Sequence, residues 1–316
     1  MSKHQKAIII SGATACGKSN LALEIAKHFK GEIVNADSLQ IYKDLPILSA
    51  QPNNIDKNQI KHHLYGLLDF TEESSVFLWL KEIKSIVAEI YKNQSLPIIV
   101  GGSGMYISKL VEGISIIPQI SIQNKQKAKQ DLDKYGLDHI IEMSKNPKIK
   151  DPQRALRAYE ILLETGKAIS YWHHQKKEKI LPNISFIHFN LNLDRQELYK
   201  RCEARFDEMI KIGAIEEASI LSKKILNQQY QIDKLPISKT LGFCELNQYL
   251  NNNINLKQLK EVASKKTRNY AKRQLTWFRN QLQNQDEHHI RININNDSKA
   301  KKEVFTVISD FLSKNC

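Results

Sequence analysis

Four short apolar runs along the chain are typical of buried β-strands. They are Ala7 to Ile10, Glu32 to Ala36, Pro97 to Val100 and Ile184 to Leu191. The segment 20–29, which follows the first run, instead repeats its apolar residues at helical spacing. Apolar strands separated by helices predict an α/β fold with a parallel sheet covered by helices on both faces. In such a sheet the working groups lie at the carboxyl ends of the strands.

The texture of the chain changes after Gly113. Residues 119–179 are rich in Lys, Gln and Asp, have helical periodicity and contain no strand-like run. This pattern predicts an all-helical domain, over 114–180, inserted into the sheet domain. The core domain is then discontinuous, with segments 1–113 and 181–316.

The C-terminal part of the core domain is expected to be helical. From Arg195 to Arg279 the spacing of apolar residues is almost wholly that of helices. The tail from Asn293 to Lys302 is low in complexity and reads as loop.

Composition and charge narrow the class of partner. The 316 residues carry 47 Lys and Arg against 34 Asp and Glu, a net charge of +13. Such an excess suggests a polyanionic partner, although a solvated basic surface explains it equally well. The four cysteines form no CxxC pair, which indicates neither a zinc site nor a disulfide framework. No apolar stretch approaches the ~18 residues of a membrane span, so we expect a soluble, cytoplasmic protein and no membrane partner.

The first predicted strand leads into a glycine-rich loop that matches the pattern G-x-x-x-x-G-K-[ST], directly before a predicted helix. Its residues are Gly12, Ala13, Thr14, Ala15, Cys16, Gly17, Lys18 and Ser19. Backbone N–H groups and the helix N-terminus can face phosphate oxygens, Lys18 adds a charge, and the Ser19 hydroxyl can hold Mg²⁺. The loop therefore predicts a diphosphate-bearing ligand. The alternative is a glycine-rich turn that binds nothing.

The position of the nearest acid argues against an ordinary nucleotide hydrolase. Many ATPases hold the metal with an aspartate after a hydrophobic strand, whereas here the strand Ile98 to Val100 runs into Gly101 and Gly102. The acid follows the preceding strand, at Asp37. A carboxylate there can take a proton from an incoming nucleophile or organise the metal. Asp37 could alternatively cap a helix.

Seven segments of the chain together resemble the tRNA dimethylallyltransferases, also called isopentenyl-diphosphate:tRNA transferases. They are SGATACGKS (11–19), NADSLQIYKDL (35–45), LPIIVGGSGMYISKLVEG (96–113), DPQRALRAYEILLETGK (151–167), RCEARFDEMIKIGAIEE (201–217), LPISKTLGFCE (235–245) and TRNYAKRQLTWFRN (267–280). The segments keep the order of the family and span nearly the whole chain. Only the phosphate loop is common in other families.

The resemblance implies a P-loop NTPase-like core and transfer of a dimethylallyl group from dimethylallyl diphosphate to tRNA. The acceptor is the exocyclic amine, N6, of adenosine 37 beside the anticodon, in tRNAs that read codons beginning with U, and diphosphate leaves. In this family the phosphate loop holds the prenyl diphosphate, although the loop is commonly labelled ATP-binding. The implied partners are the anticodon stem-loop of tRNA, dimethylallyl diphosphate and Mg²⁺, and we expect a monomer.

The same resemblance gives roles to catalytic residues. Asp37 takes the proton of the adenine amine, and Ser103 donates a hydrogen bond to the leaving oxygen. Lys18 and Mg²⁺ at Ser19 stabilise the departing diphosphate. Arg201 or Arg205, spaced i and i+4 on one helix face, can add a further charge. The alternative for this pair is a solvated basic stripe.

A further set of residues is expected to bind tRNA. Asp151 and Pro152 read as an N-cap and first helical residue, which presents the following arginines one turn apart. An Asp–Arg network at the helix start is the alternative. The helix 267–280 is basic with interleaved aromatics, which we interpret mainly as core residues. The expected tRNA-binding residues are Asp37, Ser38, Leu39, Gln40, Ser103, Lys125, Gln153, Arg154, Ala155, Leu156, Arg157, Lys239, Thr240, Leu241, Gly242, Phe243 and Cys244.

The chain departs from the usual motifs of the family at five of the candidate site residues named above. Ala13, Cys16 and Ser19 replace proline, serine and threonine, and the hydroxyl needed for a metal survives. Ser103 replaces threonine and keeps the donor but loses a stiffening methyl group. Lys239 replaces arginine, which removes bidentate phosphate recognition. None of these changes removes a catalytic group.

Two other functions are compatible with parts of the sequence. A P-loop small-molecule kinase using ATP shares the phosphate loop and the acid after the second strand, and the insertion could serve as its lid. A non-catalytic RNA-binding protein with a vestigial loop is less favoured, because Lys18, Ser19, Asp37 and Ser103 are all present.

Overall fold

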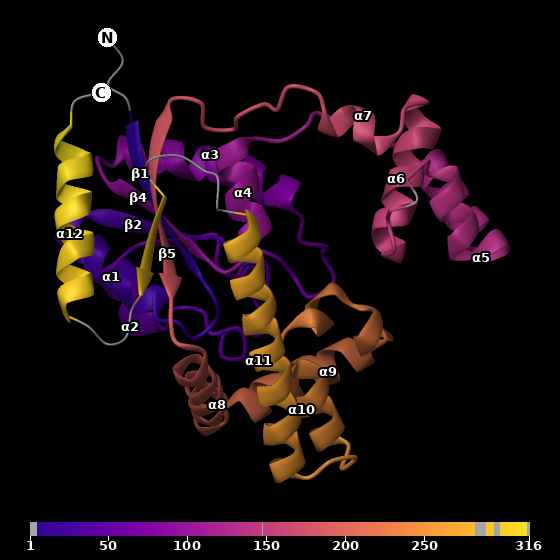
Figure 1. The fold of residues 1–316 in the computed structure, drawn as a ribbon. Helices are drawn as coiled ribbons and strands as arrows, with labels where there is room; N and C mark the ends of the chain where they lie inside the picture. The colour runs from indigo at the N-terminus through magenta and orange to yellow at the C-terminus, as the bar shows by residue number, and fades with distance from the viewer. Residues whose placement is uncertain (1–4, 147, 282–288, 294–297, 315–316) are drawn as a thin grey trace. The chain divides into compact units, whose positions relative to one another are not determined.

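The computed structural model describes residues 5–146, 148–281, 289–293 and 298–314 (Figure 1). Within them one six-stranded sheet has the order β3-β2-β4-β1-β5-β6, and every pairing is parallel. The strands are β1 (Gln5–Gly12), β2 (Gly31–Asn35), β3 (His62–His63), β4 (Leu96–Gly101), β5 (Ile184–Asn192) and β6 (His289–Asn293). The predicted α/β fold with a parallel sheet is confirmed, and all four predicted strands are present.

The helices fall into two compact units. The first unit, Met1–Val111 with Leu181–Cys316, contains the sheet, and the second is Glu112–Ile180. The sequence placed these boundaries at 113/114 and 180/181. Helices that begin in the first unit are α1 (Lys18–Phe29), α2 (Asn54–Gln59), α3 (Val76–Lys92), α4 (Gly104–Glu112), α8 (Arg195–Lys211), α9 (Ala214–Asn227), η1 (Ile232–Lys234), η2 (Pro236–Lys239), α10 (Phe243–Leu250), α11 (Leu256–Gln281) and α12 (Ser298–Ser313).

The second unit contains only helices and one isolated bridge among its described residues. Its helices are α5 (Ile122–Met143), α6 (Pro152–Thr165) and α7 (Ile169–His173). Helix α5 is interrupted at Gly136, whose φ of 83° is not helical. Asp151 caps α6 by accepting a hydrogen bond from the backbone N–H of Arg154, and Pro152 occupies the first turn. The predicted helix start at this position is confirmed.

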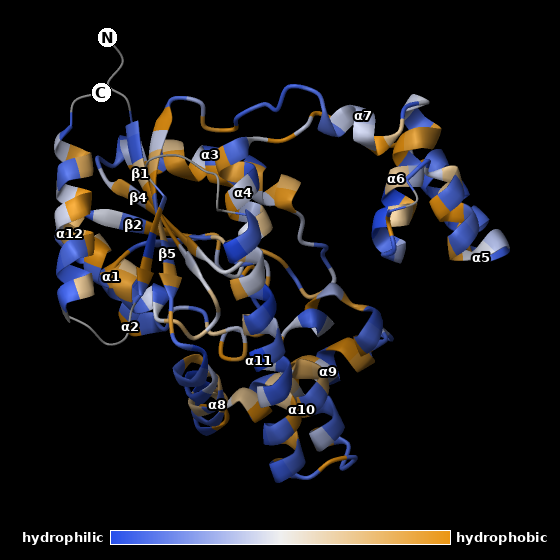
Figure 2. Ribbon diagram, in the orientation of Figure 1, coloured by the Kyte–Doolittle hydropathy of each residue, from blue (hydrophilic) through white to orange (hydrophobic). Residues whose placement is uncertain are grey.

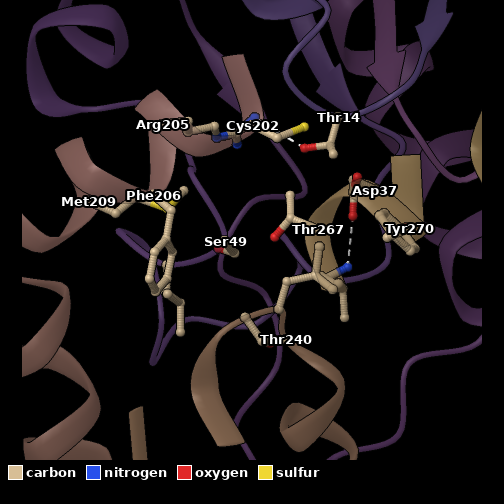
Figure 3. A pocket seen from close by; sticks show the side chains of 13 residues that line it. Thr14, Asp37, Ser49, Cys202, Arg205, Phe206, Met209, Thr240, Thr267 and Tyr270 are labelled. Carbon is tan, nitrogen blue, oxygen red and sulfur yellow. Dashed lines mark hydrogen bonds between the residues drawn. The ribbon is translucent and has the colours of Figure 1, made fainter. Parts of the chain in front are cut away.

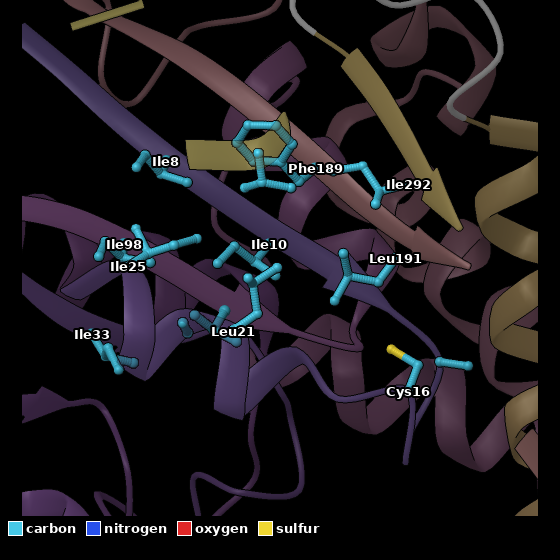
Figure 4. Packing of buried hydrophobic residues seen from close by; sticks show 14 of the residues in the cluster. Ile8, Ile10, Cys16, Leu21, Ile25, Ile33, Ile98, Phe189, Leu191 and Ile292 are labelled. Carbon is cyan, nitrogen blue, oxygen red and sulfur yellow. The ribbon is translucent and has the colours of Figure 1, made fainter. Parts of the chain in front are cut away.

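Helices cover both faces of the sheet in the first unit (Figure 1). On one face α1 and α12 pack against alternate residues of the central strands, including Ile8, Ile10 and Phe189 (Figure 4). On the other face α3 contacts β4 and α11 contacts β1. The strands are the most hydrophobic part of this unit, whereas the helices carry one apolar and one polar face (Figure 2). No described helix is long and apolar enough to cross a membrane.

The loop predicted from Asn293 to Lys302 is wrong at both ends. Asn293 belongs to β6, which pairs with β5, and α12 begins at Ser298. The apolar residues of α12, Val304, Ile308 and Phe311, recur at helical spacing and lie in the main core. Lysine and asparagine dominate the composition of residues 293–302, and the large apolar residues of α12 begin only after them, at Val304. Residues 294–297 of the predicted loop lie outside the described part of the chain.

Candidate functional site

The phosphate loop is shaped by two glycines whose backbone other residues could not adopt without strain. Gly12 has φ +147°, and a Cβ there would lie 2.6 Å from the carbonyl oxygen of Leu191 on β5. Gly17 has φ +95° and is the N-cap of α1. The side chains of Ala13 and Cys16 are buried in the core beneath the loop. These residues therefore present their backbone to a ligand, as the motif predicts.

The charged end of the loop is Lys18, the first residue of α1. Its ammonium group donates a hydrogen bond to the carbonyl oxygen of Ala13, with an Nζ–O distance of 2.6 Å. This bond lays the side chain back across the loop. The cation thus lies over the backbone that is expected to hold phosphate.

Asp37 follows β2 and is held in place by backbone bonds. Its N–H donates to the side-chain oxygen of the buried Asn35 (2.8 Å), and its Oδ1 accepts from the N–H of Leu39 (3.0 Å). Residues 38–41 form bends and turns. The carboxylate therefore caps a turn, and the alternative that it caps a helix is wrong.

The end of β4 touches the end of β2, which brings Ser103 to the Asp37 loop. The N–H of Ser103 donates to the carbonyl oxygen of Ala36 (3.2 Å), and its Oγ accepts from the N–H of Ser38 (2.9 Å). A Cβ on Gly101 would lie 2.0 Å from that same Ala36 oxygen. A side chain at position 101 is thus excluded by the approach of two strands, which explains why no acid follows β4 directly.

One cavity joins the phosphate loop to Asp37 (Figure 3). Its polar groups include Thr14 of the loop, Asp37 and Arg205 of α8, and its apolar walls include Phe206 and Met209. The full lining is Thr14, Asp37, Leu39, Leu48, Ser49, Cys202, Arg205, Phe206, Met209, Thr240, Leu241, Thr267 and Tyr270. A pocket with an acid and a phosphate-loop edge at one side and branched or aromatic walls at the other suits a ligand that is half charged and half hydrocarbon.

The two predicted arginines of α8 separate in the structure. Arg205 donates from its NH1 atom to the hydroxyl of Thr14 (3.2 Å), so it reaches the phosphate loop. Arg201 donates from Nε to Glu197 on its own helix (2.8 Å). The basic stripe is therefore not uniformly solvated, because Arg205 is a cavity residue.

The charges around the cavity affect one another. Burial lowers the pKa of Arg205, and the nearby Asp37 carboxylate opposes that shift. Burial raises the pKa of Tyr270, and Asp37 raises it further. Burial also raises the pKa of the Cys202 thiol to about 11. Tyr270 and Cys202 are therefore neutral at pH 7, which leaves Asp37 and Arg205 as the opposed charges of this cavity.

Gln274 on α11 is a site residue that the sequence reasoning missed. Its Oε1 accepts from the N–H of Thr14 (2.8 Å), and its Nε2 donates to the carbonyl oxygen of Gly102 (2.9 Å). The residue stands within the segment 267–280 that carries part of the resemblance. The segment is distinguished by its charged and aromatic residues. A neutral amide among them carries no signal except its helical spacing from Tyr270 and Trp277.

Ser19 does not line the Asp37 cavity. It lies at the exposed start of α1 and lines a second cavity with Gln40 and Asp56. Gln40, expected to bind tRNA, turns its amide onto the carbonyl oxygens of Ser49 (3.0 Å) and Ala50 (2.7 Å). Its side chain thus holds the 49–50 turn.

The segment 239–244 contributes both surface and core. Lys239 is exposed, whereas Phe243 is fully buried. Thr240 and Leu241 line the Asp37 cavity, and the buried Thr240 hydroxyl has no hydrogen-bond partner among the described residues. The thiol of Cys244 donates to the carbonyl oxygen of Ser238 (3.3 Å), and Gly242, with φ +90°, is the N-cap of α10.

In the second unit the expected tRNA-binding residues divide by burial. Lys125 on α5 is exposed, as are Gln153, Arg154 and Arg157 on α6. Ala155 is fully buried in the core of this unit and Leu156 packs against that core, so neither offers an exposed side chain. The hydrogen bond at the start of α6 joins Asp151 to the backbone N–H of Arg154. It does not use the Arg154 guanidinium, which the alternative of an Asp–Arg network at the helix start would require. Arg157 pairs with Glu160 (3.0 Å).

The fold and the loop together define a class of protein. A parallel sheet with a glycine-rich loop between β1 and α1 is the arrangement of P-loop-like α/β proteins. Within that class, residues 40–281 match the model of the IPP transferase family. The chain belongs to this family.

Curated relatives and solved structures agree with this membership. The tRNA dimethylallyltransferase of Rickettsia conorii is 40% identical over 89% of this chain and 78% of its own length. That of Pelagibacter ubique is 39% identical over 89% of this chain and 91% of its own. The crystal structure of a tRNA isopentenylpyrophosphate transferase from Bacillus halodurans aligns with a TM-score of 0.68 and 26% identity, covering 98% of this chain and 96% of that one.

A second solved structure resembles this chain in fold. A eukaryotic dimethylallyltransferase acting on tRNA aligns with a TM-score of 0.83 at 24% identity, over 98% of this chain and 80% of its own. None of these matches names a kinase, so they give the kinase alternative no support.

Proposed function

We propose that this chain is a tRNA dimethylallyltransferase that moves the dimethylallyl group of dimethylallyl diphosphate to N6 of adenosine 37, next to the anticodon. The tRNAs it serves are those that read codons beginning with U. The observation that carries the proposal is the single cavity in which Asp37 and the Arg205–Thr14 corner of the phosphate loop share apolar walls. That arrangement fits a five-carbon chain joined to a diphosphate.

The transfer breaks one bond and forms one at the same carbon. The adenine N6 attacks C1 of the prenyl chain, the C1–O bond breaks, and the electron pair leaves with diphosphate. The N6 proton passes to the Asp37 carboxylate, because a neutral aromatic amine is a poor nucleophile unless a base removes its proton as the new bond forms. Asp37 is fixed for this role by its bonds to Asn35 and Leu39.

The negative charge that gathers on diphosphate needs fixed positive partners. Arg205, Lys18 and the backbone N–H groups of the loop supply them within a partly buried site, where such contacts are stronger than in water. The Ser103 Oγ accepts from the N–H of Ser38, beside Asp37. We assign to this hydroxyl the hydrogen bond to the leaving oxygen.

The described residues offer few oxygen ligands for Mg²⁺ near the phosphate loop. Mg²⁺ is often held by one or two protein oxygens together with substrate phosphates and water. The exposed hydroxyl of Ser19 provides one such oxygen, and among the described residues no cluster of three or more His, Cys, Asp or Glu could hold a metal. When bound, the ion would neutralise charge on the leaving diphosphate.

The RNA partner is supported by charge. Exposed Arg154, Arg157 and Lys125 lie in the inserted unit, and the chain has a net charge of +13. A target base within an RNA stem-loop must be unstacked to reach a carboxylate inside a cavity, which requires the protein to hold the neighbouring backbone. Basic exposed helices suit that task.

A labelling assay tests the proposal directly. Purified chain, Mg²⁺ and unmodified tRNA are incubated with radiolabelled dimethylallyl diphosphate, and the expected product is labelled tRNA with the label on adenosine 37. A parallel reaction contains labelled ATP. Turnover of ATP with no transfer from dimethylallyl diphosphate would establish the kinase alternative and reject the proposal.

A further inference from the structure

The side chain of Gln274 joins the two loops that the proposed reaction must hold at a fixed spacing. It is 6% exposed, and its amide bonds the N–H of Thr14 and the carbonyl oxygen of Gly102. Thr14 lies in the phosphate loop after β1, and Gly102 directly precedes Ser103 after β4. One amide therefore bridges the donor-binding loop and the loop that carries Ser103.

Helix α11 packs closely on the loop after β4 at Gln274 and at Trp277, one turn further along. A Cβ on Gly102 would lie 2.3 Å from Nε2 of Gln274, and a Cβ on Gly104 would lie 2.1 Å from the ring of Trp277. Tyr270, one turn earlier on the helix, lines the cavity with Asp37. The two glycines thus let the β4 loop approach the helix, and Gln274 occupies the centre of the contact.

The chemistry of the amide suits the task. Glutamine presents an acceptor and a donor on one rigid planar group, so it can take an N–H from one loop and give one to a carbonyl of the other. A glutamate ionised at neutral pH only accepts, and a methionine of similar size does neither. Since Thr14 also bonds Arg205 through its hydroxyl, the Gln274 contact fixes a residue that holds the cation of the cavity.

We propose that Gln274 is a positioning residue for the transfer reaction. It sets the spacing between the phosphate loop and the Ser103 loop, and so aligns the prenyl diphosphate with Asp37. The amide itself contacts the backbone of both loops and the side chain of Tyr270, and it acts on the substrate through the two loops. This inference rests on the proposed function.

The test compares two substitutions of Gln274 with a matched one at the end of the same helix. Gln274→Met keeps the volume and removes both bonds, whereas Gln274→Glu keeps the acceptor for Thr14 and sets an anionic oxygen against the Gly102 carbonyl. Gln281→Met is the control, because Gln281 is exposed on α11. For each variant we would measure kcat, the KM for dimethylallyl diphosphate and for tRNA, the melting temperature, and the calorimetric affinity for inorganic diphosphate with Mg²⁺.

A positioning role predicts a particular split among these parameters. Gln274→Met should raise the KM for dimethylallyl diphosphate by about tenfold, the loss of roughly one net hydrogen bond, and weaken diphosphate binding to the same extent. Gln274→Glu should in addition lower kcat, because its anionic oxygen repels the carbonyl oxygen of Gly102 and displaces the loop that carries Ser103. The KM for tRNA should stay within about twofold, because the two lost hydrogen bonds lie beside the donor site, and Gln281→Met should match the unchanged chain.

Other outcomes overturn the inference. If Gln274→Met changes neither the donor KM nor diphosphate affinity, the bridge does not position the loop. If both KM values and the melting temperature change together, the residue only supports the fold. Diphosphate calorimetry needs no RNA, so a chain that binds diphosphate but fails to label tRNA refutes the proposed function while still testing Gln274. A chain that binds no diphosphate refutes both.

Discussion

The two sides of the candidate cavity are built in different ways. The phosphate loop takes its ligand-facing groups from eight consecutive residues, Gly12 to Ser19, and its geometry follows from two glycines and a helix start. The other side is assembled from three distant segments: Asp37 lines the cavity, whereas Ser103 and Gln274 bond the turns and loops beside it. The local motif identifies the kind of group that is bound. In the proposed function, the assembled side determines what reaction that group undergoes.

The largest expected effect comes from the assembled side. Asp37→Ala should lower kcat by about 10³-fold, the usual contribution of a general base, while tRNA binding is retained. Steady-state labelling of tRNA and a filter-binding assay measure the two quantities. If the phosphate loop alone sufficed for transfer, the variant would keep its activity and the contrast between the two sides would fail.

Asp37→Asn separates the base from the turn. The Asn oxygen can still accept from the N–H of Leu39, as Oδ1 of Asp37 does (3.0 Å), so the loop should keep its shape. Activity should nevertheless fall almost as far as in the alanine variant. An active Asn variant would show that Asp37 has only a structural role.

The next prediction tests whether the phosphate loop depends on Arg205, which is distant from it in the sequence. Arg205→Met removes the contact to the Thr14 hydroxyl and should raise the KM for dimethylallyl diphosphate by about 10- to 100-fold, because a charged hydrogen bond is lost. Arg201→Met, on the same helix, breaks a partly exposed pair with Glu197 and should change KM by less than about fivefold. Equal effects of the two substitutions would mean that the helix acts as a general basic surface.

Much of this architecture could be predicted from apolar periodicity and one contiguous motif. The strands that lead to Gly12, Asp37 and Gly101 were predicted because each is a short apolar run, and the placing of candidate site residues at their ends follows from the parallel sheet. Local patterns of this kind report on backbone geometry within a few residues. They do not report which distant helix packs on a loop.

Gln274 and α12 show the limits of that approach. A neutral amide on a basic helix carries no signal of its own until the fold brings it within 2.8 Å of Thr14 N–H. The large apolar residues of α12 begin only at Val304, and the lysines and asparagines before them outweighed that signal. The choice between Arg201 and Arg205 was equally beyond the sequence, because both lie on one helix face and only tertiary packing separates them.

A smaller effect concerns the glycine that lets α11 approach the assembled side. Gly104→Ala places a methyl group against the ring of Trp277 and should lower the free energy of unfolding by about 1–3 kcal/mol. Urea denaturation followed by circular dichroism measures the change. In a Trp277→Leu background the same substitution should be neutral or stabilising, since alanine is the better helix former at the start of α4. Additive effects in the double variant would exclude steric contact as the cause.

The smallest expected effect lies beneath the phosphate loop, where residues distant in the sequence support the end of β1. Ser11, directly before Gly12, is fully buried, and its hydroxyl contacts Nε2 of His188 (2.7 Å) and accepts from Asn190 (2.7 Å). His188 in turn meets His289 of β6, with 3.2 Å between their Nδ1 atoms. The residue directly before the motif is thus supported by β5 and, through His188, by β6.

This buried network should make stability depend on pH. Burial, and then the neighbouring His289, lowers the pKa of His188 well below 6.5, and burial likewise lowers that of His289. Above pH 6.5 both rings are neutral in the folded and unfolded chain. As the pH falls below 6.5 the unfolded chain binds protons that the folded chain refuses, so the free energy of unfolding should fall by up to about 1.4 kcal/mol per pH unit for each ring. His188→Gln should show a shallower loss between urea midpoints measured at pH 7.5, 6.5 and 5.5. Parallel curves for the two proteins would mean that His188 is protonated in the folded state, and that the network does not hold Ser11 through a neutral ring.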